Sequence, residues 1–142
     1  MSAINDALAA IADVVETISG IKKVDEPPTE QQSEYPFSIV YFQNGTLVAA
    51  PIGSKKNLFN VAVEVLTKKI KVQEDLAHVN PFLDSVPTAL IAEVADGGSQ
   101  FNHTIQTFDR IAIEFLPLYE YAGVPMIGYR FTMIDVKILV NL

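Results

Sequence analysis

The side chains best suited to chemistry in this chain are its two histidines, His78 and His103. Two histidines can bind a metal ion when nearby carboxylates, here those of Glu74 and Asp75, complete the ligand set. The surrounding sequence has no HxH, HxxH or HExxH spacing, so nothing places two ligands on one face of an element. We therefore expect exposed or hydrogen-bonded histidines, and a metal site built from both is the less favoured hypothesis.

Motifs for nucleophilic catalysis and phosphate binding are lacking as well. The chain has no cysteine and no serine within a GxSxG sequence. Gly97 and Gly98 follow a predicted helix instead of opening one, which does not fit a phosphate-binding loop. Asp109 and Glu114 are an odd number of positions apart on a predicted strand, so they face opposite ways and do not form an acid–base pair. The sequence predicts no catalytic residue, no cofactor and no metal site, and hence no enzyme.

Composition predicts a folded domain that keeps some apolar surface for a partner, because 49% of the residues are hydrophobic and only 19% are charged. The net charge of −7 argues against a protein that grips nucleic-acid backbones. Residues 55–71 are the exception, with five lysines. We expect these lysines at solvated strand ends and loops. An acidic protein neighbour is the alternative, and a nucleic-acid patch is less favoured.

Nothing in the sequence predicts a membrane span or a signal peptide. No apolar run approaches the roughly 20 residues that cross a bilayer, and the N-terminus begins Met-Ser-Ala-Ile-Asn-Asp, without a basic region. Together with the absence of cysteine, this composition predicts a protein assembled in a reducing cytosol.

Two segments predict helices. Apolar residues recur every three or four positions from Ile4 to Ile18, and Gly20 is a natural stop. Residues 72–96 predict two short helices or one bent helix, with a break at Asn80-Pro81. Between these segments, residues 22–36 carry two prolines among acids and glutamines, so we expect a flexible, extended acidic arm there.

The remaining segments predict strands. Residues 37–43 and 46–52 flank Asn44-Gly45, a dipeptide that favours a two-residue hairpin turn. Residues 58–67 alternate between an apolar face and a face carrying Asn60 and Glu64, which is typical of a half-buried strand.

The last third of the chain predicts a long antiparallel pair of strands, residues 104–116 and 126–140. Arg110 and Arg130 are expected to pair with carboxylates across this sheet, which is a structural role. Apolar residues on both faces of the return strand predict that it is covered by the protein's own helix and by a neighbouring subunit.

These segments define an α+β fold with the order α-β-β-β-α-β-β: a mainly antiparallel sheet with an N-terminal helix and a second helical segment packed on it. Residues 1–142 show no internal repeat and no second domain boundary, so we expect a single domain. Turn and aromatic residues that fit a protein–protein contact form the candidate interface set. That set is Asn44, Gly45, Tyr119, Tyr121, Tyr129 and Phe131.

This arrangement resembles the tail-terminator and tail-completion proteins of long-tailed bacteriophages. The resemblance covers nearly the whole chain: an N-terminal amphipathic helix ending at Gly20-Ile21, a hairpin led by Pro36-Phe37, the strand at residues 59–66, a helical segment, a Gly-Gly turn and two long closing strands. The acidic stretch at residues 22–36 departs from the family pattern. It leaves open whether the chain is the terminator itself or a neighbouring neck or head-completion ring protein.

The resemblance implies a virion structural protein that forms a homo-oligomer, a hexameric ring. Such a ring caps the tail tube protein, stops its polymerisation and joins the tail to the head-tail connector or neck proteins. DNA would pass through the lumen without specific binding, and no enzymatic activity or cofactor is implied. A small ligand-binding or enzymatic α+β domain, with a pocket near His78 or His103, and a cellular adaptor are the alternatives from other classes.

Overall fold

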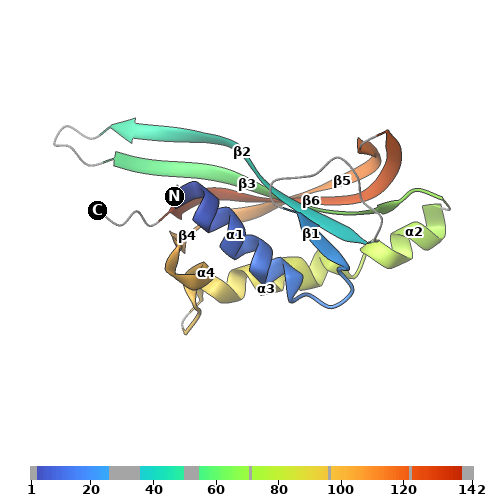
Figure 1. The fold of residues 1–142 in the computed structure, drawn as a ribbon, viewed down its shortest axis with the longest axis horizontal. Helices are drawn as coiled ribbons and strands as arrows, with labels where there is room; N and C mark the ends of the chain where they lie inside the picture. The colour runs from blue at the N-terminus through green and yellow to red at the C-terminus, as the bar shows by residue number, and fades with distance from the viewer. Residues whose placement is uncertain are drawn as a thin grey trace.

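A twisted β-sheet carries all of the described helices on one of its faces (Figure 1). The computed structural model describes residues 3–25, 36–49, 55–70, 72–95, 97–121 and 123–138. In chain order the elements are α1 (Ala3–Glu16), β1 (Lys23–Asp25), β2 (Phe37–Ala49), β3 (Lys55–Lys68), α2 (Val72–Val79), α3 (Phe82–Val94), α4 (Gln100–His103), β4 (Ile105–Thr107), β5 (Arg110–Tyr121) and β6 (Val124–Ile138).

The sheet has six strands in the order β1-β2-β3-β6-β4, with β5 also paired to β6. β1 joins β2 in parallel, and every other pair is antiparallel. The N-terminal helix is followed by strands, then by helices, and then by strands again. This confirms the predicted α+β class with a mainly antiparallel sheet.

Helix α1 buries the apolar stripe predicted for it. Ile11 and Val15 are fully buried against the sheet, and Ile18 is nearly so in the turn after the helix. The helix ends at Glu16, four residues before the predicted stop, and Gly20 lies in the turn that follows, with a φ of 97° that glycine adopts at little cost. Burying each of these aliphatic side chains contributes roughly 1.5–3 kcal/mol relative to leaving it in water, so this stripe fixes α1 on the sheet.

The predicted hairpin turn at Asn44-Gly45 is wrong. Both residues lie within the continuous strand β2, and their Cα partners on β3 are Asn60 and Phe59. The Asn44 side chain accepts a 2.6 Å hydrogen bond from Asn60, while a Cβ on Gly45 would lie 2.4 Å from the Phe59 ring. The register of β2 against β3 shifts just before this pair, between Phe42 and Asn44, where a bulge lies, and Gly45 makes room for an aromatic ring.

The helical segment divides as predicted, because Asn80 and Pro81 separate α2 from α3. After α3 the chain forms a left-handed turn that the sequence pattern does not predict. Four consecutive residues, Gln100–His103, have φ between 51° and 62°, which makes α4 a single left-handed turn. Phe101 in this turn is fully buried in the main core, so packing offsets the cost of left-handed backbone.

The predicted strand at residues 104–116 is instead two strands. β4 pairs with the C-terminal end of β6 and β5 pairs with the rest, with Asp109 at the break. Part of the predicted arm also belongs to the sheet, because Lys23–Asp25 form β1 and Lys22 N–H donates to the Pro36 carbonyl at 2.8 Å. The rest of the predicted arm, residues 26–35, lies outside the described residues.

The second face of the sheet is covered at one end by the β5–β6 hairpin, which curls over it (Figure 1). Leu116 and Met126 from this hairpin pack on Phe37, Ile39 and Leu66. The register of β5 against β6 shifts between Leu116 and Tyr119, where the hairpin bends. The sheet therefore holds a second, smaller core away from the helices.

Candidate functional site

A row of polar side chains crosses four strands on the face of the sheet opposite the helices. Glu64 of β3, Arg130 of β6 and Glu114 of β5 are direct cross-strand partners. Arg130 donates from Nε to Glu64 Oε2 and from Nη1 to Glu114 Oε1, both at 2.8 Å. The Tyr41 hydroxyl of β2 donates to the same Glu64 oxygen. We call these four residues the polar belt.

Burial decreases along the belt from its centre. The Glu64 side chain is fully buried, that of Arg130 is 21% exposed and that of Glu114 is 56% exposed. Glu64 Oε1 is also buried and has no hydrogen-bond partner among the described residues. A buried carboxylate is costly unless it is paired, so Arg130 is the group that makes Glu64 tolerable.

The pKa values of Tyr41 and Arg130 in the belt, and of Tyr119, which is not one of the four, are all shifted upward. Burial, and then the hydrogen bond to Glu64, raise the pKa of the Tyr41 hydroxyl. Burial and the charge of Glu64 also raise the pKa of Tyr119. Burial lowers the pKa of Arg130 while Glu64 raises it, and the net shift is upward. The two tyrosines thus stay neutral and Arg130 stays charged.

These shifts define what the belt can do chemically. A tyrosine with a raised pKa is a hydrogen-bond donor and a poor source of phenolate. Arg130 is already shared between two carboxylates. The belt therefore ties β2, β3, β6 and β5 together across the sheet, as the sequence predicted for Arg130. Arg110, by contrast, pairs with its neighbour Asp109 and not across the sheet.

A second feature of the sheet is the exposed apolar surface of edge strand β5. Ile113, Phe115 and Leu118 are 49%, 44% and 69% exposed. Phe42, on β2, is 44% exposed as well and packs edge-on against Phe59. Large apolar side chains gathered along a strand edge are typical of protein–protein contacts.

The structure does not bring the predicted interface residues into one surface. Phe131 was predicted at an interface, and this is wrong for the protomer surface, because Phe131 is fully buried beneath the helices. Tyr129 is half-buried, stacks near Phe115 and donates to Asn80 Oδ1 at 2.7 Å. Tyr119 is half-buried against the smaller core.

The other three members of that set lie in strands. Asn44 and Gly45 are exposed, but they lie in the middle of β2 and not at a projecting tip. Tyr121 pairs with Val124 at the end of β5. The six residues therefore lie at separate places in the sheet and not together at hairpin tips.

The histidines do not form a joint site. His78 lies in α2 and His103 in α4, at opposite ends of the helical layer (Figure 1). Asp75, predicted as a possible ligand, accepts a 2.8 Å hydrogen bond from the Ile70 amide. Across the part of the chain that the structure describes, no three His, Asp or Glu side chains group as metal ligands would.

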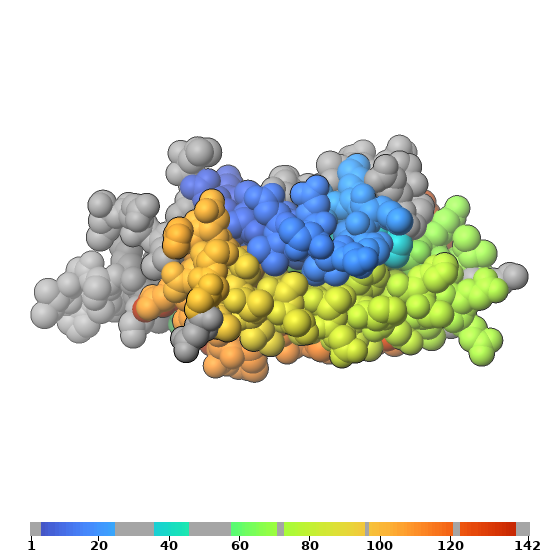
Figure 2. Space-filling view, turned by 90° about the horizontal axis from the view of Figure 1, so that it is seen from below, coloured from blue at the N-terminus to red at the C-terminus, as the bar shows by residue number. Residues whose placement is uncertain are grey.

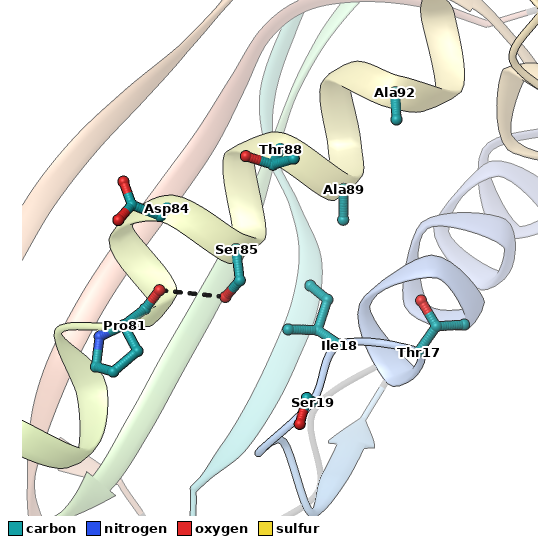
Figure 3. A pocket seen from close by; sticks show the side chains of 9 residues that line it. All are labelled: Thr17, Ile18, Ser19, Pro81, Asp84, Ser85, Thr88, Ala89 and Ala92. Carbon is teal, nitrogen blue, oxygen red and sulfur yellow. Dashed lines mark hydrogen bonds between the residues drawn. The ribbon is translucent and has the colours of Figure 1, made fainter.

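A shallow groove of about 450 Å³ lies on the helical face, between the end of α1 and α3. The two helices lie side by side on this face (Figure 2). Ile18, Ser85 and Ala89 point into the space between them (Figure 3). The Ser85 hydroxyl already donates to the Pro81 carbonyl at 3.3 Å, and that of Thr17 donates to Val14. These hydroxyls are therefore engaged with their own backbone and do not converge on a ligand.

The sequence predicted the cross-strand pairing of Arg130, but not its buried partner Glu64, the link to Tyr41 or the exposed strand edge. The signal for the belt was a glutamate on a strand of valines and an arginine among apolar residues on the return strand, since such charges must pair when buried. The sequence does not indicate that β5 is an exposed edge strand, because Ile113 and Phe115 alternate with their neighbours in the same way as buried strand residues do.

Comparison with models of known protein families and with curated protein sequences gave no match. Within the described ranges, no helix has the length and apolar character needed to cross a membrane.

Proposed function

We propose that this chain is a ring-forming structural subunit of a bacteriophage tail: a tail terminator that caps the tail tube, stops its polymerisation and joins the tail to the head-side connector. The observation that carries the proposal is the row of exposed apolar side chains on β5, namely Ile113, Phe115 and Leu118. The resemblance in element order supplies the biological setting.

A β-strand that exposes its edge together with large apolar side chains invites association, and proteins that remain monomeric usually protect such an edge. A contact between two different patches generates a closed ring when its rotation closes. The polar belt supports this role, because four strands tied across their width form a stiff wall that keeps its edges in register.

Charge is consistent with a DNA passage. The chain carries a net charge of −7, and an acidic lumen does not trap a polyanion as a basic one would. The expected partners are further copies of this chain, the tail tube protein and connector or neck proteins. A neighbouring neck ring would use the same ring contacts and differ in the partner above and below.

Electron microscopy of a phage carrying a deletion of this gene tests the proposal. Loss of a terminator should give tails of uncontrolled length that do not join heads, and the supplied protein should restore normal tails. Normal tails on the deletion phage would refute the assignment. Tails of normal length that fail to join heads would favour the neck ring.

A further inference from the structure

The sheet leaves two opposite edges open among the described residues. On one side, no described strand pairs with the outer edge of β5. On the other side, β1 pairs with Phe37–Ile39 of β2, and from Val40 onward no described strand pairs with this edge of β2. Backbone N–H and C=O groups along such edges are ready to pair with another chain.

The exposed apolar side chains of both edges lie on the same face of the sheet. Ile113 is the cross-strand partner of the core residue Phe131, and Phe42 is the partner of the core residue Val61. Directly opposite residues in a strand pair point to the same face. Ile113 and Phe42 therefore both lie on the face that carries the helices.

Strand direction makes the two edges complementary. β2, β3, β6 and β5 are antiparallel in succession, so β5 runs opposite to β2. Placing β5 of one copy beside β2 of the next gives a further antiparallel pair, with both sheets in the same orientation and all helices on one side. Phe42 of one copy then meets Ile113 or Phe115 of the other.

The composition of the two edges also fits this contact. Residues 41–49 of β2 carry no charged side chain and no proline, two of the devices that protect an open edge, and the one irregularity in this stretch is the bulge between Phe42 and Asn44. On β5, Pro117 has no N–H to donate, which confines pairing to residues 110–116. A two-fold contact between two β5 strands would leave Phe42 and its edge uncovered, whereas a β5–β2 contact covers both.

We propose that residues 110–116 of one copy add as an antiparallel strand to residues 41–49 of the next, joining the sheets of successive copies into one wall with all of the helices on the same side. This inference rests on the proposed ring-forming function and names the surfaces that build the ring.

Engineered disulfides test the contact, because the chain has no cysteine of its own. Phe42→Cys combined with Ile113→Cys, and Phe42→Cys combined with Phe115→Cys, cover the two registers that bring the side chains together. Within one copy these positions lie on strands three spacings apart, about 14 Å, which is beyond the reach of a disulfide. Any bond therefore joins two copies. Phe42→Cys combined with Ile91→Cys is the matched control, since Ile91 is 52% exposed on α3, away from both edges.

We expect one of the two edge pairs to give a ladder of covalent oligomers under mild oxidation, while the control pair and the single variants stay unlinked. Dimers from Ile113→Cys alone would show a two-fold β5 contact and overturn the inference. If mass measurements show oligomers but neither edge pair forms a disulfide, the β5–β2 contact is overturned while the proposed ring-forming function still stands. A chain that stays monomeric at every concentration, alone and with tail tubes, would overturn both.

A second variant tests the same contact without cysteine chemistry. Ile113→Lys places a charge on the exposed face of β5, where the monomer tolerates it. We expect the concentration needed for assembly to rise by about tenfold or more, with an unchanged circular dichroism spectrum. Assembly at the wild-type concentration would contradict the proposal.

Discussion

Arg130 lies directly opposite Glu64 on neighbouring strands, and its Nε donates a 2.8 Å hydrogen bond to a carboxylate that is fully buried. The same guanidinium reaches Glu114 on the next strand. One arginine on β6 therefore links β3, β6 and β5 across the sheet. If both edges of the sheet serve assembly, this link keeps the two edges in a fixed arrangement.

Removing Arg130 should destabilise the fold severely. Arg130→Leu leaves the buried Glu64 charge without its partner, and breaking a buried ion pair from one side costs about 3–5 kcal/mol. Urea unfolding measures this loss. Arg110→Leu is the matched control, because its ion pair with Asp109 is exposed and should change stability by less than about 1 kcal/mol. Equal effects of the two substitutions would contradict the role given to Arg130.

Tyr41 should make stability depend on alkaline pH. Because its folded-state pKa is raised above the ordinary value of 10, its contribution is complete below about pH 10 and is lost as the pH rises further. Tyr41→Phe should be less stable than wild type near pH 8, since the hydrogen bond to Glu64 is gone. The difference between the two proteins should shrink above pH 10. The measurement is the free energy of unfolding of wild type and Tyr41→Phe at several pH values from 8 to 11. A difference between the two proteins that stays constant over this range would exclude the coupling.

Glycine at two positions makes room for neighbouring atoms, and the cost of adding a methyl group should differ between them. A Cβ at Gly128 would lie 1.9 Å from the Val65 carbonyl oxygen, which is backbone, whereas one at Gly45 would meet the Phe59 side chain. A side chain can shift and a sheet backbone cannot, so Gly128→Ala should cost more than Gly45→Ala, for which we expect about 1–3 kcal/mol. Phe59→Ala should make Gly45→Ala nearly neutral. A turn at Gly45 would predict no such rescue.

Because His103 lies in the left-handed turn α4 and His78 in a right-handed helix, substitution by glycine should change stability in opposite directions at the two positions. His103 has a φ of 62° and is exposed, so His103→Gly should relieve backbone strain and stabilise the protein by up to about 1 kcal/mol. His78 is exposed in the last turn of the right-handed helix α2, and His78→Gly should cost about 0.5–1 kcal/mol. The melting temperatures of the two variants test this expectation. A loss of stability in both variants would contradict the claim that the backbone at His103 is strained.

The sequence predicted most of the fold where local pattern and packing agree. The stripe from Ile4 to Ile18 and the break at Asn80-Pro81 are periodic or steric signals that tertiary structure preserved. The predicted turn at Asn44-Gly45 failed because the same two residues also suit a strand that pairs with Asn60 and makes room for the Phe59 ring, and both of these partners lie on another strand. The turn at Gln100–His103 failed because burial of Phe101, a long-range effect, overrides local backbone preference.

The site was less predictable than the fold. The polar belt can be predicted only if the strand register is known, since Glu64 and Arg130 are far apart in sequence and meet only when β3 pairs with β6. The exposure of Ile113 and Phe115 requires knowledge of which strand ends the sheet. Alternating apolar residues predict a buried face, and only the sheet order reveals that the helices do not cover this part of it.

The most direct test of the central claim is the mass of the purified chain in solution, measured over a range of concentrations by light scattering or native mass spectrometry. A ring subunit predicts a closed species of defined copy number, six for the tail-terminator assignment, either alone or on contact with tail tubes. A mass equal to one chain under both conditions would contradict the account.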